Sequence, residues 1–384
     1  MKYLIIGGGP CGDSAAKEII KRDPQGEVTV LSEENYVPYR RLALTKQAWT
    51  GPFETISLKT DTAKINTVLG AKALELDENS QTVTASDGKT YSYDRLLIAT
   101  GISPRRLPYE GIIYLRTYED FLNLKKSVGK GKKVTVIGAG FTGLELAGEL
   151  KKQGCEVNLL FPENIPCTKV LPEKFCQDIY DSMEKGGVIM CPRETAESVE
   201  RAEGKYKIIT SKKREIICDT VVAGVGNTCN IPFGSKLVSE NGIKTDSHLE
   251  TNIKNVYAAG DVAQFPSRLF GADMRKEFMD NALKSGKCAA ANMCGSEIEY
   301  NPVINTFFDT FDVGYKAVGE YGMNFRVSYK EVKDGYVIFY RNENVLCGVV
   351  FWNVKPALAT AIKCIEDRLT LSDEEYLYMM KYMD

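Results

Sequence analysis

The chain has 384 residues, of which 43% are hydrophobic, and its formal net charge at pH 7 is −2. This length favours roughly two or three domains with sizeable cores, and the near balance of interspersed acidic and basic residues argues against a nucleic-acid binder, which usually carries a basic stripe. No apolar run is long enough to span a membrane, and Met1 leads directly into an apolar, strand-like run rather than a signal peptide, so a cytoplasmic location is expected.

The first predicted element is a short buried strand, "KYLII", that runs into the glycine loop Gly7-x-Gly9-x-x-Gly12 and then into a helix, "DSAAKEIIKR". In this pattern one glycine makes a tight turn, one lets the backbone approach a pyrophosphate, and one permits close helix–strand contact, while the helix N-terminus attracts the phosphates. The next strand, "EVTVLSE", ends at Glu33, about twenty residues further on, where an acidic residue accepts hydrogen bonds from an adenosine ribose. Its neighbour Glu34 is interpreted as a solvated turn charge.

A second copy of this pattern begins in the middle of the chain. The strand "KKVTVIGAG" leads into a loop whose three glycines are Gly138, Gly140 and Gly143. The helix "FTGLELAGELKKQG" follows, closed by Gly154 as a C-cap, and then the strand "CEVNLLF". Phe161 occupies the usual acid position, so Glu163, two residues on, is the candidate ribose ligand. No arginine cluster follows that would suit a 2′-phosphate, which favours NADH over NADPH.

Two complete fingerprints predict two dinucleotide sites. One would hold a flavin permanently, and the other would admit a nicotinamide that delivers a hydride and leaves. A redox sensor that binds both dinucleotides and signals by a change of shape would have the same fold and stays open as an alternative.

Further segments resemble the pyridine-nucleotide-disulfide oxidoreductase family of two-dinucleotide flavoproteins. They are "YSYDRLLIATG", which ends in Thr100 and Gly101, "DTVVAGVGNTCN", and "TNIKNVYAAGDVAQF", which contains Asp261. The resemblance implies FAD and NADH as cofactors, places Thr100 and Gly101 at the FAD site, and puts Asp261 on the ribityl chain of FAD.

The cysteines distinguish among the branches of this family. Some members carry C-x4-C beside the flavin, others C-x-x-C in the NAD domain, and others a single cysteine near position 40. This chain has eleven cysteines, none with C-x-x-C spacing and none between Cys11 and Cys155, so thiol redox catalysis at those places is excluded. Scattered reduced thiols in a reducing cytosol are expected instead. No metal site is predicted, because the sole histidine, His248, lies in a polar, turn-like stretch.

The segment "PYRRLALTKQAW" is similar to the branch of ferredoxin reductases, rubredoxin reductases and apoptosis-inducing factor. This resemblance implies that Arg41 and Lys46 lie close to the flavin, with Lys46 near N5 of the ring and Glu145, on the second glycine helix, as its partner. A buried lysine needs such a partner, and a cation there favours the electron-rich reduced ring. The alternative is two surface charges that never meet.

The C-terminal segments "FDVGYKAVGE" and "GYVIFYRNENVLCGVVFWN" resemble the C-terminal domain of apoptosis-inducing factor, and "NLLFPENIPCTKVLPE" resembles its NAD segment, where the equivalent of Glu163 faces the ribose. The family's flavin-side histidine falls at Phe278 and its tryptophan near Phe307. A phenyl ring can still cover a flat flavin, so Phe307 is a candidate flavin contact. Ordinary core packing of Phe307, Phe308 and Phe311 is the alternative. The family's DNA-associated role is not expected, since the overall charge is not basic.

The expected fold class is α/β, with two doubly wound Rossmann-like domains and a C-terminal α+β domain. We expect a discontinuous FAD-binding domain in residues 1–110 and 231–296, a NAD-binding domain in residues 111–230, and a C-terminal domain in residues 297–384. The last segment, "LSDEEYLYMMKYMD", starts with Ser372 and Glu375 spaced as a capping box, and its stripe of Tyr and Met is interpreted as packing, with an oligomer surface as the alternative.

The sequence therefore predicts an FAD-dependent NADH oxidoreductase that passes a hydride from NADH to FAD and electrons to an unidentified acceptor. The first alternative is an NADH:rubredoxin or ferredoxin reductase, and the second is a redox-gated NADH-binding signalling protein. The expected partners are NADH and either a small electron-carrier protein or a quinone, and the expected assembly is a monomer or a homodimer.

Overall fold

The computed structural model describes residues 1–383 and divides into two compact units. The first contains Met1–Ser103 and Asn227–Pro302, and the second contains Pro104–Gly226 together with the chain from Val303 on. Each unit is thus built from two separate stretches of chain. The second unit includes both the expected NAD-binding domain and the expected C-terminal domain, and the finer division into three domains stays a prediction.

The first unit is centred on a parallel sheet of five strands in the order β18-β7-β1-β2-β3. Its strands are β1 (Lys2–Ile6), β2 (Glu27–Ser32), β3 (Ile65–Leu69), β7 (Arg95–Ile98) and β18 (Val256–Ala258). Side chains alternate between the two faces, so that Tyr3 and Ile5 join one core while Leu4 and Ile6 join the other. A strand that is buried on both faces is typical of parallel sheets in α/β proteins.

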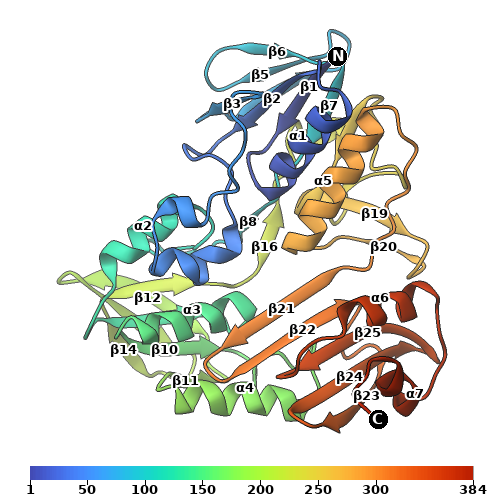
Figure 1. Cartoon of the computed structure of the whole chain (residues 1–384). Coiled ribbons are helices and arrows are strands. Elements are labelled where there is room, and N and C mark those ends of the chain that lie inside the picture. Colours follow the sequence, from blue (N-terminus) through green and yellow to red (C-terminus); the bar gives the residue numbers. More distant parts are fainter. Residues whose placement is uncertain (384) are drawn as a thin grey trace. The chain divides into compact units, whose positions relative to one another are not determined.

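Helices α1 (Pro10–Arg22) and α5 (Met279–Met293) lie side by side on one face of this sheet (Figure 1). Small residues let them approach closely, because a Cβ added at Gly286 would lie 2.5 Å from the carbonyl oxygen of Cys11. The other face is covered by an antiparallel sheet formed by β4 (Ala73–Asp77), β5 (Thr82–Ala85) and β6 (Thr90–Ser92). The predicted strand–loop–helix–strand unit and the hairpin-like segment after it are therefore present.

Short elements complete the first unit. They are η1 (Arg41–Thr45), η2 (Gln47–Trp49), η3 (Phe53–Thr55), β8 (Ile102–Pro104), β16 (Asn227–Cys229), η4 (Gly234–Lys236), β17 (Ile243–Lys244), η5 (Gly260–Val262), β19 (Ala263–Ser267) and β20 (Ala272–Met274). Strand β8 pairs with β16, and β19 lies between β17 and β20. Strands β8 and β16 lie where the chain leaves this unit after Ser103 and returns to it at Asn227.

The second unit contains a parallel sheet in the order β11-β10-β9-β15 and an antiparallel sheet β12-β13-β14. The elements are α2 (Tyr118–Ser127), β9 (Lys133–Ile137), α3 (Phe141–Lys152), β10 (Glu156–Phe161), α4 (Glu173–Lys185), β11 (Ile189–Pro192), β12 (Ala196–Ala202), β13 (Lys205–Thr210), β14 (Glu215–Cys218) and β15 (Thr220–Ala223). Gly154 follows α3 with φ of +86°, the left-handed conformation that lets glycine end a helix. The second glycine pattern therefore also lies on a strand, a loop and a helix.

The C-terminal part of this unit is an antiparallel sheet in the order β21-β22-β25-β24-β23, followed by two helices. The elements are β21 (Asn305–Thr310), β22 (Val313–Gly319), β23 (Arg326–Val332), β24 (Gly335–Asn342), β25 (Val345–Trp352), α6 (Leu358–Glu366) and α7 (Asp373–Met379). The Ser372 hydroxyl accepts a hydrogen bond from the Glu375 N–H, and the Glu375 carboxylate accepts one from the Ser372 N–H, which confirms the predicted capping box at the start of α7. The predicted antiparallel sheet with helices is likewise present.

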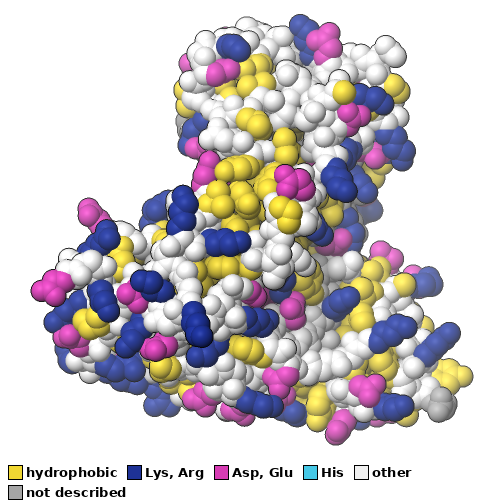
Figure 2. Space-filling view, turned by 60° about the vertical axis from the view of Figure 1, so that its left-hand side comes forward, with side chains coloured by type: hydrophobic (Ala, Val, Ile, Leu, Met, Phe, Trp, Pro, Cys, Tyr) yellow, Lys and Arg dark blue, Asp and Glu magenta, His cyan; other side chains and the backbone are white. Residues whose placement is uncertain are grey.

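The surface mixes charged side chains of both signs. Figure 2 shows Lys and Arg side chains interspersed with Asp and Glu side chains on the face that it displays. Within residues 1–383, none of the helices is both long enough and apolar enough to cross a bilayer.

Candidate cofactor-binding sites

The glycines of the first loop are required for three different geometric reasons. Gly7 has φ of +118°, and a Cβ there would lie 2.2 Å from the carbonyl oxygen of Ala99. A Cβ at Gly12 would lie 2.0 Å from the carbonyl oxygen of Gly7, so that α1 can contact the loop only through glycine. A Cβ at Gly9, in contrast, would lie 3.8 and 3.9 Å from the nearest atoms, which are the Nη2 and Nε of the Arg41 guanidinium. The loop thus leaves an open cradle beside a cation.

The first turn of α1 lies directly beside this cradle. The helix begins at Pro10 with Gly9 as its N-cap, and no side chain caps it. The backbone N–H groups of a first turn have no partner within their own helix, and with the helix dipole they attract phosphate. The cradle, the uncapped helix end and the neighbouring guanidinium together fit the pyrophosphate of a dinucleotide.

The other residues predicted to bind FAD lie along the same edge of the sheet. Strands β1, β7 and β18 are parallel, with Ile98 opposite both Ile6 and Ala258. The segments that follow them therefore end at the same edge, and these segments contain Gly7, Thr100, Gly101, Gly260 and Asp261. The structure thus brings the widely separated first loop, "ATG" and "GD" segments together.

Hydrogen bonds fix two of these segments in place. Thr100 donates through its hydroxyl to the carbonyl oxygen of Asn230 at 2.6 Å, and the Asn230 amide donates back to the carbonyl oxygen of Thr100 at 3.0 Å. The Gly260 N–H donates to the Ser285 hydroxyl at 2.9 Å. Helix α5, which carries Ser285, therefore helps to position Asp261.

Arg41 belongs to a partly buried cluster with Glu34 and Tyr39. The Arg41 guanidinium pairs with the Glu34 carboxylate and donates to the Tyr39 hydroxyl at 3.1 Å, and Tyr39 donates to Glu34 at 2.5 Å. Burial lowers the pKa of Arg41, but Tyr39, Glu34 and Asp261 raise it, and the net direction is upward. Arg41 is therefore a fixed cation. The interpretation of Glu34 as a solvated turn charge is wrong, because its side chain is only 14% exposed and anchors Arg41.

Glu33, the predicted ribose ligand, directly follows β2 and, unlike Glu34, faces solvent. Its carboxylate accepts a hydrogen bond from Lys72 at 3.0 Å, and its side chain is 68% exposed. Its position at the strand end is the expected one, and its contact with a ribose stays a prediction.

The nearest thiol to this loop is Cys11, the second residue of α1. Burial raises its pKa to about 12 and the carboxylate of Asp261 adds to this, while a hydrogen bond with Ser285 acts in the opposite direction. A thiol needs to ionise to act as a nucleophile. All eleven cysteines are unpaired, and Cys11 is protonated at neutral pH. Cys11 therefore has the properties of a packing residue.

The second glycine loop has the same geometry as the first. Gly138 has φ of +102°, and a Cβ there would lie 2.4 Å from the carbonyl oxygen of Gly224. A Cβ at Gly143 would lie 2.0 Å from the carbonyl oxygen of Gly138, while one at Gly140 would meet no atom within 4 Å. Helix α3 starts at Phe141 with Gly140 as its N-cap and, like α1, has no side-chain cap. The chain therefore contains two pyrophosphate cradles of one design.

Glu163 lies beyond the end of β10, at the edge where the second loop lies. The Gly138 N–H donates to the carbonyl oxygen of Leu160 at 2.8 Å, which places the loop beside the end of β10. Arg193 also lies here, because its N–H donates to the carbonyl oxygen of Glu163 at 3.0 Å. Arg193 was not predicted from the sequence, because it does not follow β10 but arrives from the end of the neighbouring strand β11. The parallel pairing of β10 with β11 is the signal that identifies it.

Lys46 and Glu145, the predicted catalytic pair, are both half-buried. Lys46 lies between η1 and η2 in the first unit, and Glu145 lies on α3 in the second. Their pairing would join residues of the two units and stays a prediction.

The three phenylalanines near the predicted flavin contact have different surroundings. Phe308 is 1% exposed and packs at 5.2 Å from the ring of Phe141, so it is a core residue. Phe307, its neighbour on β21, is 46% exposed and therefore does not pack in a core. Phe311 lies in the β21–β22 turn with the ammonium of Lys152 above its ring at 5.9 Å. Core packing is confirmed for Phe308 and wrong for Phe307, whose flavin contact stays a prediction.

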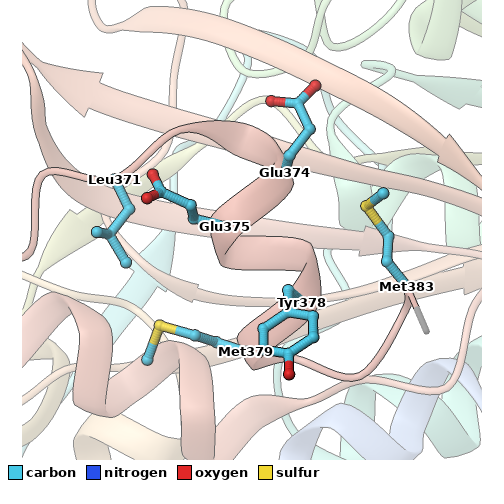
Figure 3. Close-up of a pocket in the computed structure, with 6 residues that line it drawn as sticks. All are labelled: Leu371, Glu374, Glu375, Tyr378, Met379 and Met383. Atoms are coloured by element: carbon cyan, nitrogen blue, oxygen red, sulfur yellow. The ribbon is translucent and has the colours of Figure 1, made fainter.

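The C-terminal helix carries a shallow hollow of about 480 Å³ (Figure 3). Its lining residues come from α7 and its flanks: Leu371, Glu374, Glu375, Tyr378, Met379 and Met383. Tyr378 is 68% exposed, so the interpretation of the whole Tyr and Met stripe as packing is wrong for this residue. Tyr376 on the same helix is buried as expected.

Comparison with known proteins agrees with this geometry. The family model described as pyridine nucleotide-disulphide oxidoreductase matches residues 1–286. Rhodocoxin reductase of Rhodococcus erythropolis is 30% identical over 317 residues, covering 79% of this chain and 74% of that protein. A candidate mitochondrial apoptosis-inducing factor 1 of Drosophila melanogaster is 30% identical over 368 residues, covering 83% of this chain and 50% of that protein.

A solved structure matches nearly the whole chain. In the crystal structure of the covalent putidaredoxin reductase–putidaredoxin complex, the matched chain has a TM-score of 0.91 at 25% identity, with 98% of this chain and 95% of that chain covered. The chain belongs to the pyridine nucleotide-disulphide oxidoreductase family. It is an FAD-dependent NAD(P)H oxidoreductase that binds FAD and NAD(H), which confirms the predicted fold class, class of enzyme and cofactors.

Proposed function

We propose that this protein is an NADH-dependent reductase of a small iron–sulfur electron carrier of the ferredoxin or rubredoxin type. The observation that carries the proposal is the likeness to putidaredoxin reductase, which extends over 98% of the chain and so includes the C-terminal sheet as well as both glycine loops. Relatives named as a ferredoxin–NAD(+) reductase component and a rubredoxin–NAD(+) reductase support the same class of acceptor.

The residues assigned to the two cofactors divide between the two units. The uncapped end of α1, Arg41 and Asp261 would hold FAD, and the uncapped end of α3 with Glu163 would hold NADH. When bound, FAD accepts a hydride as an electron pair and can release its electrons singly. Lys46, with Glu145 as its partner, would place a cation beside the ring and favour the electron-rich form.

The state of the cysteines supports direct transfer from flavin to acceptor. A dithiol relay requires an accessible thiolate close to the flavin. Cys11, the thiol next to the first glycine loop, is buried and its pKa is raised to about 12. Electrons would therefore leave the flavin without an intermediate disulfide. Eleven unpaired thiols also support the proposed cytoplasmic location, because the cytosol keeps thiols reduced.

The acceptor can be identified by anaerobic double-mixing stopped flow. The holoprotein is first reduced with NADH and then mixed with a [2Fe–2S] ferredoxin, a rubredoxin, a quinone or oxygen at equal concentrations. We expect reoxidation of the flavin by one of the two iron–sulfur proteins to be about a hundredfold faster than by quinone or oxygen, a difference of ~2.7 kcal/mol in barrier height.

Two results would contradict the proposal. Faster reoxidation by quinone would identify a quinone reductase. Slow reoxidation by every acceptor, together with a long-lived complex of the reduced protein with NAD⁺ and a change in oligomeric state, would favour the redox-gated signalling protein.

A further inference from the structure

We propose that Arg193 determines how well the second dinucleotide site accepts NADPH in addition to NADH. The inference concerns the adenosine end of that site and rests on the assignment of Glu163 as the ribose ligand. It does not depend on which acceptor receives the electrons.

The first observation is the position of Arg193 relative to Glu163. Strands β10 and β11 are parallel with Phe161 opposite Pro192, so the residues that follow them leave the same edge of the sheet side by side. The Arg193 N–H donates to the carbonyl oxygen of Glu163 at 3.0 Å, which ties the two segments together. The predicted ribose ligand and an arginine thus share one short stretch of edge.

The second observation is the state of the Arg193 side chain. Its Nε donates to the Oδ1 of Asn164 at 3.0 Å, which holds the guanidinium beside the loop that carries Glu163. Within residues 1–383 its two Nη groups have no protein partner, and the residue is exposed. A guanidinium with both Nη groups available can bind a phosphate through two parallel hydrogen bonds.

The third observation is the charge around this edge. Glu194, which follows Arg193, is 6% exposed and pairs with Arg214 at 3.2 Å and Lys212 at 3.8 Å. The buried carboxylate of Glu194 is therefore matched by two cations. Glu163 has no ion pair among the described residues. Its carboxylate thus repels an anion at this place. The exposed Arg193 guanidinium is a cation positioned to oppose it, beside the Lys212 ammonium, which donates to the carbonyl oxygen of Pro192 at 3.0 Å.

The two cofactors differ at this position by a single group. The ribose 2′-hydroxyl of NADH can donate to the Glu163 carboxylate, whereas the 2′-phosphate of NADPH is repelled by it. Arg193 contributes little to the binding of NADH, whereas its charge attracts the 2′-phosphate of NADPH. The preference for NADH is therefore the difference between two opposed contributions, which come from residues on two strands.

The test is isothermal titration calorimetry of the FAD-loaded full chain with NADP⁺ and with NAD⁺. Arg193→Asn removes the charge and suits the left-handed backbone at this position, where φ is +56°. We expect it to weaken NADP⁺ binding about tenfold and NAD⁺ binding less than twofold. Arg193→Lys, which keeps the charge but not the planar fork, should weaken NADP⁺ binding by an intermediate amount.

The matched control is Arg201→Asn, which removes an arginine near the far end of β12 that packs on the ring of Tyr206. It should leave the ratio of the two dissociation constants unchanged. In a second comparison, Glu163→Gln should strengthen NADP⁺ binding about tenfold in the presence of Arg193 and much less in the Arg193→Asn background. Raising the salt concentration should weaken NADP⁺ binding more than NAD⁺ binding.

The inference is overturned if Arg193→Asn weakens both cofactors equally or neither. It is also overturned if Glu163→Gln has the same effect in both backgrounds. These outcomes are distinct from failure of the proposed function, since neither measurement includes an electron acceptor.

Discussion

Adjacent residues with the same chemistry have different roles at the end of β2. Glu33 faces solvent and binds Lys72, while Glu34 turns inward to Arg41 and Tyr39. The alternation of side chains beyond a strand end does not determine which of two glutamates is buried, because the path of the following coil decides it. The sequence predicted Arg41 as a cofactor residue from its motif, but not the carboxylate that holds it.

Arg41→Met should loosen FAD. The change removes the cation beside Gly9 and leaves Glu34 partly buried without its counter-ion, a loss that is costly for a buried pair. We expect the dissociation constant of FAD, measured by flavin fluorescence, to rise by at least about tenfold. The control is Arg40→Met, because Arg40 donates to the carbonyl oxygen of Thr55 in an exposed position. An equal effect of both variants would show that Arg41 has no special role.

Cys11 should be dispensable for the chemistry. Its pKa, raised by burial to about 12, lies above the ordinary value, so the thiol stays protonated at every pH below that value and resists alkylation. Cys11→Ala should therefore keep the rate of flavin reduction by NADH within about threefold. Mass spectrometry after iodoacetamide treatment of the folded protein at pH 8 should find Cys11 unmodified. Rapid labelling with loss of activity would identify a reactive thiol.

The two glycine loops are the elements that the sequence predicted best. Each is a contiguous strand–loop–helix signature, and the first and third glycines of each loop have closely similar steric surroundings in the structure. Features that depend on long-range pairing were predicted less well. Arg193 reaches the second site only through the register of β10 with β11, and the exposure of Phe307 depends on which face of β21 it occupies.

Substituting the third glycine of each loop should separate the two cofactor sites. A Cβ at Gly12 or Gly143 would lie 2.0 Å from a carbonyl oxygen, so each helix would have to shift away from its loop. Gly143→Ala should retain FAD but weaken NADH binding at least about tenfold, or ~1.4 kcal/mol, in anaerobic titrations. Gly12→Ala should lose FAD from the purified protein. The two variants are controls for each other, and loss of both cofactors from both would contradict separate sites.

The contact between α1 and α5 should also be sensitive to a larger side chain. Gly286→Val places a side chain where a Cβ alone would lie 2.5 Å from the carbonyl oxygen of Cys11. Overpacking of this kind costs about 1–3 kcal/mol, and here it also displaces the start of α1. We expect a lower melting temperature and weaker FAD retention. Lys287→Val, on the exposed side of the same helix, should change neither. Equal melting temperatures for both variants would contradict close packing at Gly286.

At the scale of the whole molecule, the same dinucleotide-binding device occurs in both compact units, each assembled from two stretches of chain. The repeated motif alone predicted two sites, and the resemblance to known flavoproteins predicted which cofactor each one holds. The predicted pairing of Lys46 with Glu145 could not be deduced from the repeated motif, because it depends on how one unit meets the other. Direct transfer from flavin to acceptor requires the flavin to be the sole store of the electron pair that NADH delivers.

Anaerobic titration of the FAD-loaded protein with NADH tests this requirement most directly. The flavin absorbance should bleach completely after one molecule of NADH per FAD, because a single two-electron carrier accepts a single hydride. Consumption of a second molecule of NADH per FAD, accompanied by the appearance of two new titratable thiols, would reveal a disulfide centre and contradict the account. A purified protein that neither contains nor binds FAD would contradict it as well.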